Sequence, residues 1–474
     1  MPSESAAPKK AKLYRNPKVM VLALNAMLVM LGFGLVGPSL SFYLIALEGG
    51  LTQPPGPGYT VPNEVVAQYS VIFGVMMAAF MATRTLLARF WGGISDEYGR
   101  KPLLLTGLVG YVLLLFAFGA AQNWIHLLLI RAGQGVVSAM VWPVAQAALM
   151  DIVGSKARGE GLGLYMMVSS TGYIIGPGLG GFLYNFSRDV LLLPVPHVFR
   201  VPYYIAAAIV LPSVFLTFII LDETAPAKND ESGVEVVIDN GPALVQIPAE
   251  PIEETEDEMN PKTRRLVNVL YIMAATDGIA MGLGQPLFQL YLMSRITTDI
   301  GLLGLIISGA GAIGMFFSIP SGRYADRHGR KGLAVSGAIG ARLSLGVLPL
   351  TSTIPQTSGV WVAQSAGMAV SQPAMRALQA DIVPWHLRGK LFGTIQAFFN
   401  AGATLGPLVG GGLFAFFSLT TLQLGPLSIG GVVIPFWIAA VLGIISALLV
   451  WFFVDETHPT KIVEADDEAV IDAT

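Results

Sequence analysis

The sequence lacks cysteine entirely and has only five histidines among its 474 residues. Without cysteine, disulfide bonds and thiol catalysis are excluded. The histidines show no metal-ligand spacing and there is no nucleotide-binding loop, so we expect neither an enzyme, nor a metal site, nor a cofactor. The net charge is −3. Because the chain is not basic, its charge gives no indication of a nucleic-acid partner.

Charge is scarce and long apolar runs are abundant. Charged residues make up 12% of the chain and hydrophobic residues 53%, whereas soluble proteins carry roughly 25% charge. A spanning helix needs about 20 apolar residues. Twelve such stretches occur at about 18–46, 65–90, 102–121, 124–150, 160–186, 202–221, 266–293, 300–321, 332–352, 358–382, 389–417 and 433–454. Because a helix satisfies its own backbone in lipid, this predicts an all-α integral membrane protein.

The distribution of Lys and Arg predicts the orientation of these helices. If the N-terminus is inside, only Arg188, Arg200 and Arg295 of the 28 basic residues fall on the outer side. The first apolar run follows a basic segment and is too long for a signal-peptide core, so it is expected to be a spanning helix. We therefore expect an inner or plasma membrane protein with both termini cytoplasmic.

The chain is a duplication. Asp96 and Arg100 recur as Asp326 and Arg330, 230 positions later, and Pro177 recurs as Pro407. Two parallel six-helix bundles with a central cavity are the expected result. The predicted parts are a tail at 1–17, bundles at 18–221 and 265–454, an acidic linker at 222–264 and a tail at 455–474. The linker is interpreted as a flexible spacer, with a regulatory docking site as the alternative.

Two motifs occur in both copies. The loop 92–101 can form a tight turn in which Arg100 bridges to Asp151 at the end of helix four; the alternative is a plain basic loop. Its predicted members are Gly92, Asp96, Gly99, Arg100, Lys101 and Asp151, with Asp326, Arg330 and Asp381 in the second copy. The second motif bends a helix and lets it approach others closely; ordinary small-residue packing is the alternative. Its members are Gly172, Gly176, Pro177, Gly180, Gly181, Gly406 and Pro407.

Several polar residues lie inside the apolar runs. Asp277 is deep in helix seven, where a carboxyl group can exchange a proton; a structural hydrogen-bonding role is the alternative. Arg131 in helix four has Trp361 as its counterpart, and Arg342 in helix nine has no partner that the sequence identifies. The remaining polar residues predicted at the proton or substrate site are Gln134, Asn25, Gln285 and Gln364.

Together these motifs resemble the drug/proton antiporter branch of the major facilitator superfamily, over about residues 18–455. The loop 92–101, Arg131 with Gln134, the glycine spacing of 163–181 and the first-helix pattern 31–38 carry the resemblance, although Ser41 stands where a second proline is common. The resemblance implies that the loop residues form a cytoplasmic latch, that the glycine motif is a hinge and that Arg131 takes part in proton coupling. Many members have an acid in helix one, where this chain has Asn25.

The sequence thus predicts a secondary transporter that exports small amphipathic compounds in exchange for protons by alternating access. Its expected partners are a small-molecule substrate, protons and the lipid bilayer; the proton gradient is the expected energy source, and the expected state is a monomer. One alternative is a facilitator or proton symporter for a sugar, peptide or organic anion. Another is a membrane receptor or scaffold that acts through its linker and tail.

Overall fold

The computed structural model describes residues 13–224, 260–383, 387–424 and 427–457. Most residues of the predicted N-terminal tail, acidic linker and C-terminal tail lie outside these ranges. The first half of the chain consists of η1 (Leu13–Arg15), α1 (Pro17–Val36), η2 (Gly37–Ser39), α2 (Leu40–Leu47), α3 (Asn63–Tyr98), α4 (Arg100–Ala120), α5 (Trp124–Asp189) and α6 (His197–Ile220).

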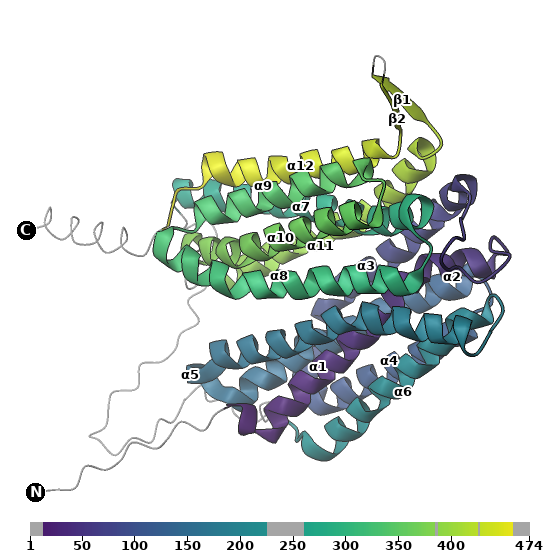
Figure 1. Cartoon of the computed structure of the whole chain (residues 1–474). Helices are drawn as coiled ribbons and strands as arrows, with labels where there is room; N and C mark the ends of the chain where they lie inside the picture. Colours follow the sequence, from purple (N-terminus) through teal and green to yellow (C-terminus); the bar gives the residue numbers. More distant parts are fainter. Residues whose placement is uncertain (1–12, 225–259, 384–386, 425–426, 458–474) are drawn as a thin grey trace, which may run out of the picture.

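The second half repeats this order. It consists of α7 (Pro261–Tyr291), η4 (Leu292–Ile296), α8 (Ile300–His328), α9 (Lys331–Val347), η5 (Leu348–Leu350), α10 (Ile354–Ile382), α11 (Arg388–Phe417), β1 (Thr421–Leu424), β2 (Leu427–Gly430) and α12 (Val433–Phe453). The sequence did not predict the antiparallel hairpin β1–β2, in which Thr421 pairs with Gly430. It projects from one end of the molecule (Figure 1).

The element α5 contains two helices. Gly154 has a φ of 68° and interrupts the helical backbone, a conformation that favours glycine. The chain therefore reverses with almost no loop between predicted helices four and five. Ten helices in the described ranges are long and apolar enough to cross a membrane. The 155–189 part of α5 and α10 fall short of that threshold because glycine and polar residues replace apolar ones.

The helices form two groups, with α1, α4, α5 and α6 on one side and α7 to α12 on the other (Figure 1). Across the interface α5 packs on α8, and α11 packs on α3. Buried aromatic side chains fill the first half, where Tyr203 stacks on Phe118 with ring centroids 5.2 Å apart. This twelve-helix architecture agrees with the fold expected from the sequence.

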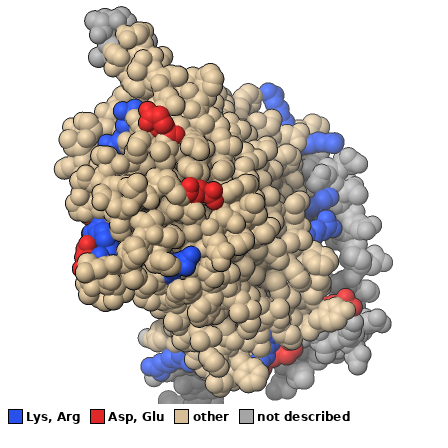
Figure 2. All heavy atoms as spheres, turned by 90° about the vertical axis from the view of Figure 1, so that its right-hand side faces the viewer, with Lys and Arg blue, Asp and Glu red and all other residues tan. Residues whose placement is uncertain are grey.

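One end of the molecule carries the connections 48–62, 190–196 and 292–299; following the predicted orientation, we name it the outer end. Figure 2 shows a mostly uncharged surface at this end. Thr298 donates to the carbonyl oxygens of Gly56 at 2.9 Å and Tyr59 at 2.7 Å. The 49–62 connection of the first half is thereby joined to the second half.

Candidate transport site

Three neighbouring cavities lie along the inside of the molecule. Two of them, of about 50 and 40 Å³, lie between the halves and share Phe33, Met77, Arg131 and Gln285 in their walls. The third, of about 320 Å³, is enclosed by helices of the second half. The second and third share Met281 and Phe399 in their walls, so the three cavities are neighbours.

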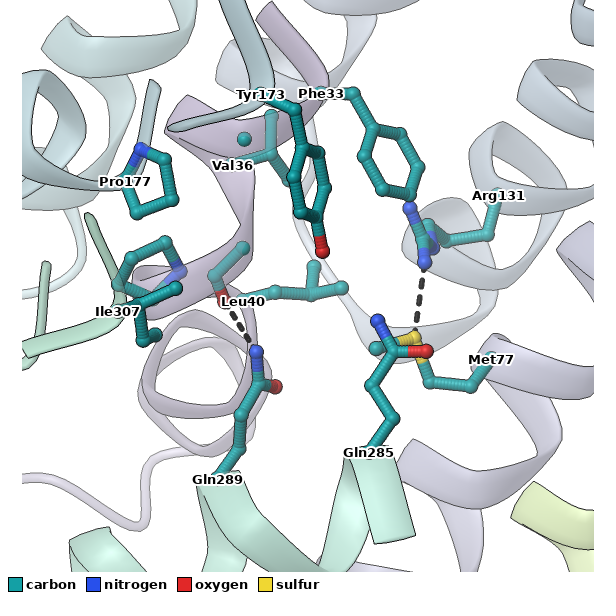
Figure 3. A pocket seen from close by; sticks show the side chains of 13 residues that line it. Phe33, Val36, Leu40, Met77, Arg131, Tyr173, Pro177, Gln285, Gln289 and Ile307 are labelled. Carbon is teal, nitrogen blue, oxygen red and sulfur yellow. Dashed lines mark hydrogen bonds between the residues drawn. The ribbon is translucent and has the colours of Figure 1, made fainter. Parts of the chain in front are cut away.

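Arg131 of α5 lines both of the first two cavities. Its side chain is 3% exposed and donates to Gln134 Oε1 at 3.0 Å and to Met77 Sδ at 2.9 Å. The guanidinium carbon lies 5.5 Å from the ring centre of Phe33 and 5.0 Å from that of Phe80. Figure 3 shows the guanidinium beside Phe33, with its bond to Met77. The cation is thus held by neutral groups.

The opposite wall of the first cavity comes from the second half. Gln285 and Gln289 of α7 project from below toward Tyr173 and Arg131 (Figure 3). Gln289 Nε2 donates to the carbonyl oxygen of Gly37 at 3.0 Å. That carbonyl lies in the short η2 turn, where Pro38 supplies no backbone donor. Polar side chains of both halves therefore meet at this cavity.

The large cavity is lined by Asp277, the acid predicted from the sequence, and by Arg342, which turns out to be its partner. Arg342 Nη2 of α9 donates to Asp277 Oδ1 of α7. The Arg342 side chain is 4% exposed and that of Asp277 is 26% exposed, so the acid faces the cavity more than the cation does. Gly443 of α12 lets the arginine pass, because a methyl group at this glycine would overlap the guanidinium stem.

Flexible apolar side chains form much of the remaining wall. Met273, Met281, Met368 and Met375 line the large cavity together with Arg376 and Gln379. Methionine is unbranched and polarisable, and it adapts to ligands of different shape. Sequence reasoning did not identify these residues as cavity-lining, although the sequence shows two of these methionines in α7 and two in α10.

Other predicted site residues lie elsewhere. Asn25 is buried between α1 and α6, where its Nδ2 donates to Thr217 Oγ1 at 2.5 Å, and it lines none of these three cavities. Gln134 and Gln364 also lie outside their walls. Trp361, the counterpart of Arg131, stacks on Phe288 with ring centroids 3.4 Å apart. The position that is a buried cation in one half is therefore an aromatic stack in the other.

The loop motif forms the same cluster in each half. Arg100 binds Asp96 at 2.6 Å and Asp151 at 3.0 Å. Arg330 binds Asp326 at 3.3 Å and Asp381 at 2.5 Å. The turn glycines Gly99 and Gly329 have φ values of 106° and 107°, a conformation that other residues rarely adopt. The Arg100–Asp151 bridge expected from the sequence is present, and its role as a latch stays a prediction.

Sequence reasoning missed a carboxylate in each cluster. Glu223 accepts from the backbone amides of Arg100 and Lys101, and Glu456 accepts from those of Arg330 and Lys331. These acids follow α6 and α12, so each half fastens its last helix to the start of its third. The available signal was the repeat of Asp-Glu-Thr after both helices. Asp96 instead binds the Arg100 side chain.

The predicted hinge glycines lie at helix crossings. Methyl groups at Gly172, Gly176 and Gly180 would overlap the backbone of α1, and one at Gly181 would overlap that of α8. In the second half Gly402 and Gly406 meet α7, while Gly411 meets the carbonyl oxygen of Ser70 on α3. Thus α5 contacts α8 of the second half through Gly181, and α11 contacts α3 of the first half through Gly411. Bending at Pro177 and Pro407 stays a prediction.

No cluster of metal-ligating side chains occurs in the part of the chain that the structure describes. Instead, two homologous helix bundles enclose a row of cavities with polar groups at the interface and in one half. These features define a membrane transporter of small molecules.

The comparisons with known proteins agree with this class. The family model of the Major Facilitator Superfamily matches residues 22–264 and 270–471, and the chain belongs to this family. It is 25% identical to the quinolone resistance protein NorA of Staphylococcus aureus strain MSSA476, over 64% of this chain and 66% of NorA. It is 28% identical to the class H tetracycline resistance protein of Pasteurella multocida, over 79% of this chain and 86% of that protein.

Solved structures show the same fold. A bacterial homologue of the human lysosomal transporter Spinster, in an inward-facing and occupied conformation, superposes with a TM-score of 0.68. The match covers 94% of this chain and 97% of that structure at 16% identity.

Proposed function

We propose that this transporter exports small amphipathic compounds in exchange for protons, with Asp277 as the group that takes up and releases the proton. The observation that carries the proposal is the Asp277–Arg342 pair in the wall of the largest of the three cavities. The partly exposed carboxylate is accessible from the cavity, while its buried partner is held in place. The names of two relatives, which refer to resistance to quinolones and tetracycline, support drug-like substrates.

The pair gives protonation a structural consequence. Ionised Asp277 is bound to Arg342, so a proton that neutralises the carboxylate removes the main attraction between α7 and α9 at this point. Arg376 also lines this cavity and adds a second positive charge to its wall. Exchange follows if substrate binding and protonation favour different positions of these helices, since a ligand shifts an equilibrium only by its differential affinity.

The test is transport in proteoliposomes with an imposed pH gradient and a panel of lipophilic cations, neutral drugs and lipophilic carboxylic acids. We expect the gradient to drive accumulation by the wild type, and Asp277→Asn to bind substrate but only equilibrate it. Asp455→Asn is the matched control, because this carboxylate is 79% exposed and lies outside the cavity.

Accumulation by Asp277→Asn equal to that of the wild type would rule out Asp277 as the coupling group. If the wild type equilibrates every compound regardless of pH, a facilitator replaces the antiporter.

A further inference from the structure

We propose that the Arg131 pocket binds the acidic group of the substrate, so that the transported compounds carry a carboxylate or a similar anion beside an apolar body. This inference rests on the transport function proposed above and narrows its substrate class. It is carried by the contacts of Arg131, by unused hydrogen-bond donors around it and by the shape of the adjoining space.

The first argument is charge balance. Arg100, Arg330 and Arg342 each contact a carboxylate. Among the described residues, no Asp or Glu forms an ion pair with Arg131; its neighbours are an amide oxygen, a thioether and two aromatic rings. A buried cation without an anion is costly in a membrane. A negatively charged ligand would supply the missing charge.

The second argument is the set of unused donors. Arg131 Nε is buried and has no hydrogen-bond partner in the described structure, and the same holds for Nε2 of Gln134, which contacts Arg131 from outside the cavity walls. A carboxylate offers two acceptor oxygens, and the planar guanidinium binds such a group through parallel hydrogen bonds. Gln285 lines the same cavity from the other half, so one anion placed there would contact both halves.

The third argument is the apolar surroundings. Phe33 and Phe80 flank the guanidinium, and Met281 and Phe399 form the wall that this pocket shares with the large cavity. The two cavities beside Arg131, of about 50 and 40 Å³, have room for a head group only. The 320 Å³ cavity beyond them is in the size range of small-molecule sites. A ligand could place an acidic head beside Arg131 and pack an apolar body against the methionines of the neighbouring large cavity, away from its Asp277–Arg342 pair.

The test uses ligand pairs that differ only in charge. Naphthalene, biphenyl and indole carboxylic acids and their methyl esters are titrated into the purified full-length protein by calorimetry, without a membrane gradient. We expect at least one acid to bind about tenfold more tightly than its ester, since a hydrogen bond to a charged group contributes about that factor. Arg131→Gln should abolish the preference, and Arg131→Lys should retain part of it because the charge remains.

Arg84→Gln is the control. Arg84 is an arginine of α3 in the same half, and it lines none of the three cavities. The inference is overturned if the wild type binds no acid more tightly than its ester. It is also overturned if Arg131→Gln and Arg131→Lys both weaken the binding of acid and ester to the same extent. Melting temperatures of all variants separate binding from misfolding.

The two proposals fail separately. Acid preference without gradient-driven transport would remove the antiport proposal and keep this one, whereas gradient-driven export of cations without acid preference would do the reverse.

Discussion

The carboxylate of Glu223 accepts a hydrogen bond from the backbone amide of Arg100 at 2.7 Å, where α4 begins. Glu456 does the same for Arg330 at 2.7 Å, where α9 begins. A negative charge at a helix N-terminus is stabilising because the first amides have no partner within the helix. In both halves, therefore, the chain segment after the sixth spanning helix supplies the cap of the third.

Replacing either capping acid should loosen its own half. We expect Glu223→Gln and Glu456→Gln each to lower stability by about 0.5–1 kcal/mol, because an amide still accepts hydrogen bonds but carries no charge. Thermal unfolding in detergent measures this effect. Asp222→Asn, which removes an exposed partner of Lys18 instead, should have a smaller effect. If Asp222→Asn lowers the stability as much as the Glu223 and Glu456 variants do, the capping charges have no specific stabilising effect.

A methyl group at the crossing of α11 and α3 should separate the halves at the outer end. The Cβ of Gly411→Ala would overlap the carbonyl oxygen of Ser70, whereas Gly412→Ala meets no atom within 4 Å. Since the native chain has no cysteine, spin labels can be placed at engineered cysteines at Val190 and Leu419, both exposed. We expect the label-to-label distance to increase in Gly411→Ala only. Unchanged distances in both variants would contradict the close-packing interpretation.

The ion pair in the large cavity should behave as a unit. Arg342→Gln leaves Asp277 without its partner and should destabilise the protein by on the order of 3 kcal/mol. Adding Asp277→Asn removes the uncompensated charge, so the double variant should be more stable than Arg342→Gln alone. Thermal unfolding of the wild type, both single variants and the double variant gives the coupling energy. Additive effects would show that the two side chains do not depend on each other.

Much of the fold follows from the sequence because the relevant signals are local. Apolar length predicts the helices, and the repeated loop motif predicts the Arg100–Asp151 and Arg330–Asp381 contacts, since each motif fixes its own turn. The twelve helices were therefore predictable. A reversal between residues 150 and 160 was predicted as well, but not that the single residue Gly154 would interrupt the helix there with almost no loop.

The site was less accessible to sequence reasoning because it depends on how distant helices pack. Asp277 was recognised as an unusual acid, but its pairing with Arg342 requires the positions of α7, α9 and Gly443 of α12. Asn25 was predicted at the site only because of its place in helix one; its bond to Thr217 directs it to α6 instead. That Arg131 has only neutral neighbours is likewise a property of the assembled bundle.

The contacts that join the halves at the outer end are chemically uniform. Thr298 to Gly56, Gln289 to Gly37, Ser70 to Gly411 and Gly178 to Ser308 are all hydrogen bonds between uncharged groups; Asn185 to Asp299 is the exception. Dissolved ions screen charges and leave such bonds almost unaffected. With the predicted orientation, this closure should therefore be nearly as strong in brine as in fresh water, so that a change in outside salinity would leave its strength almost unchanged.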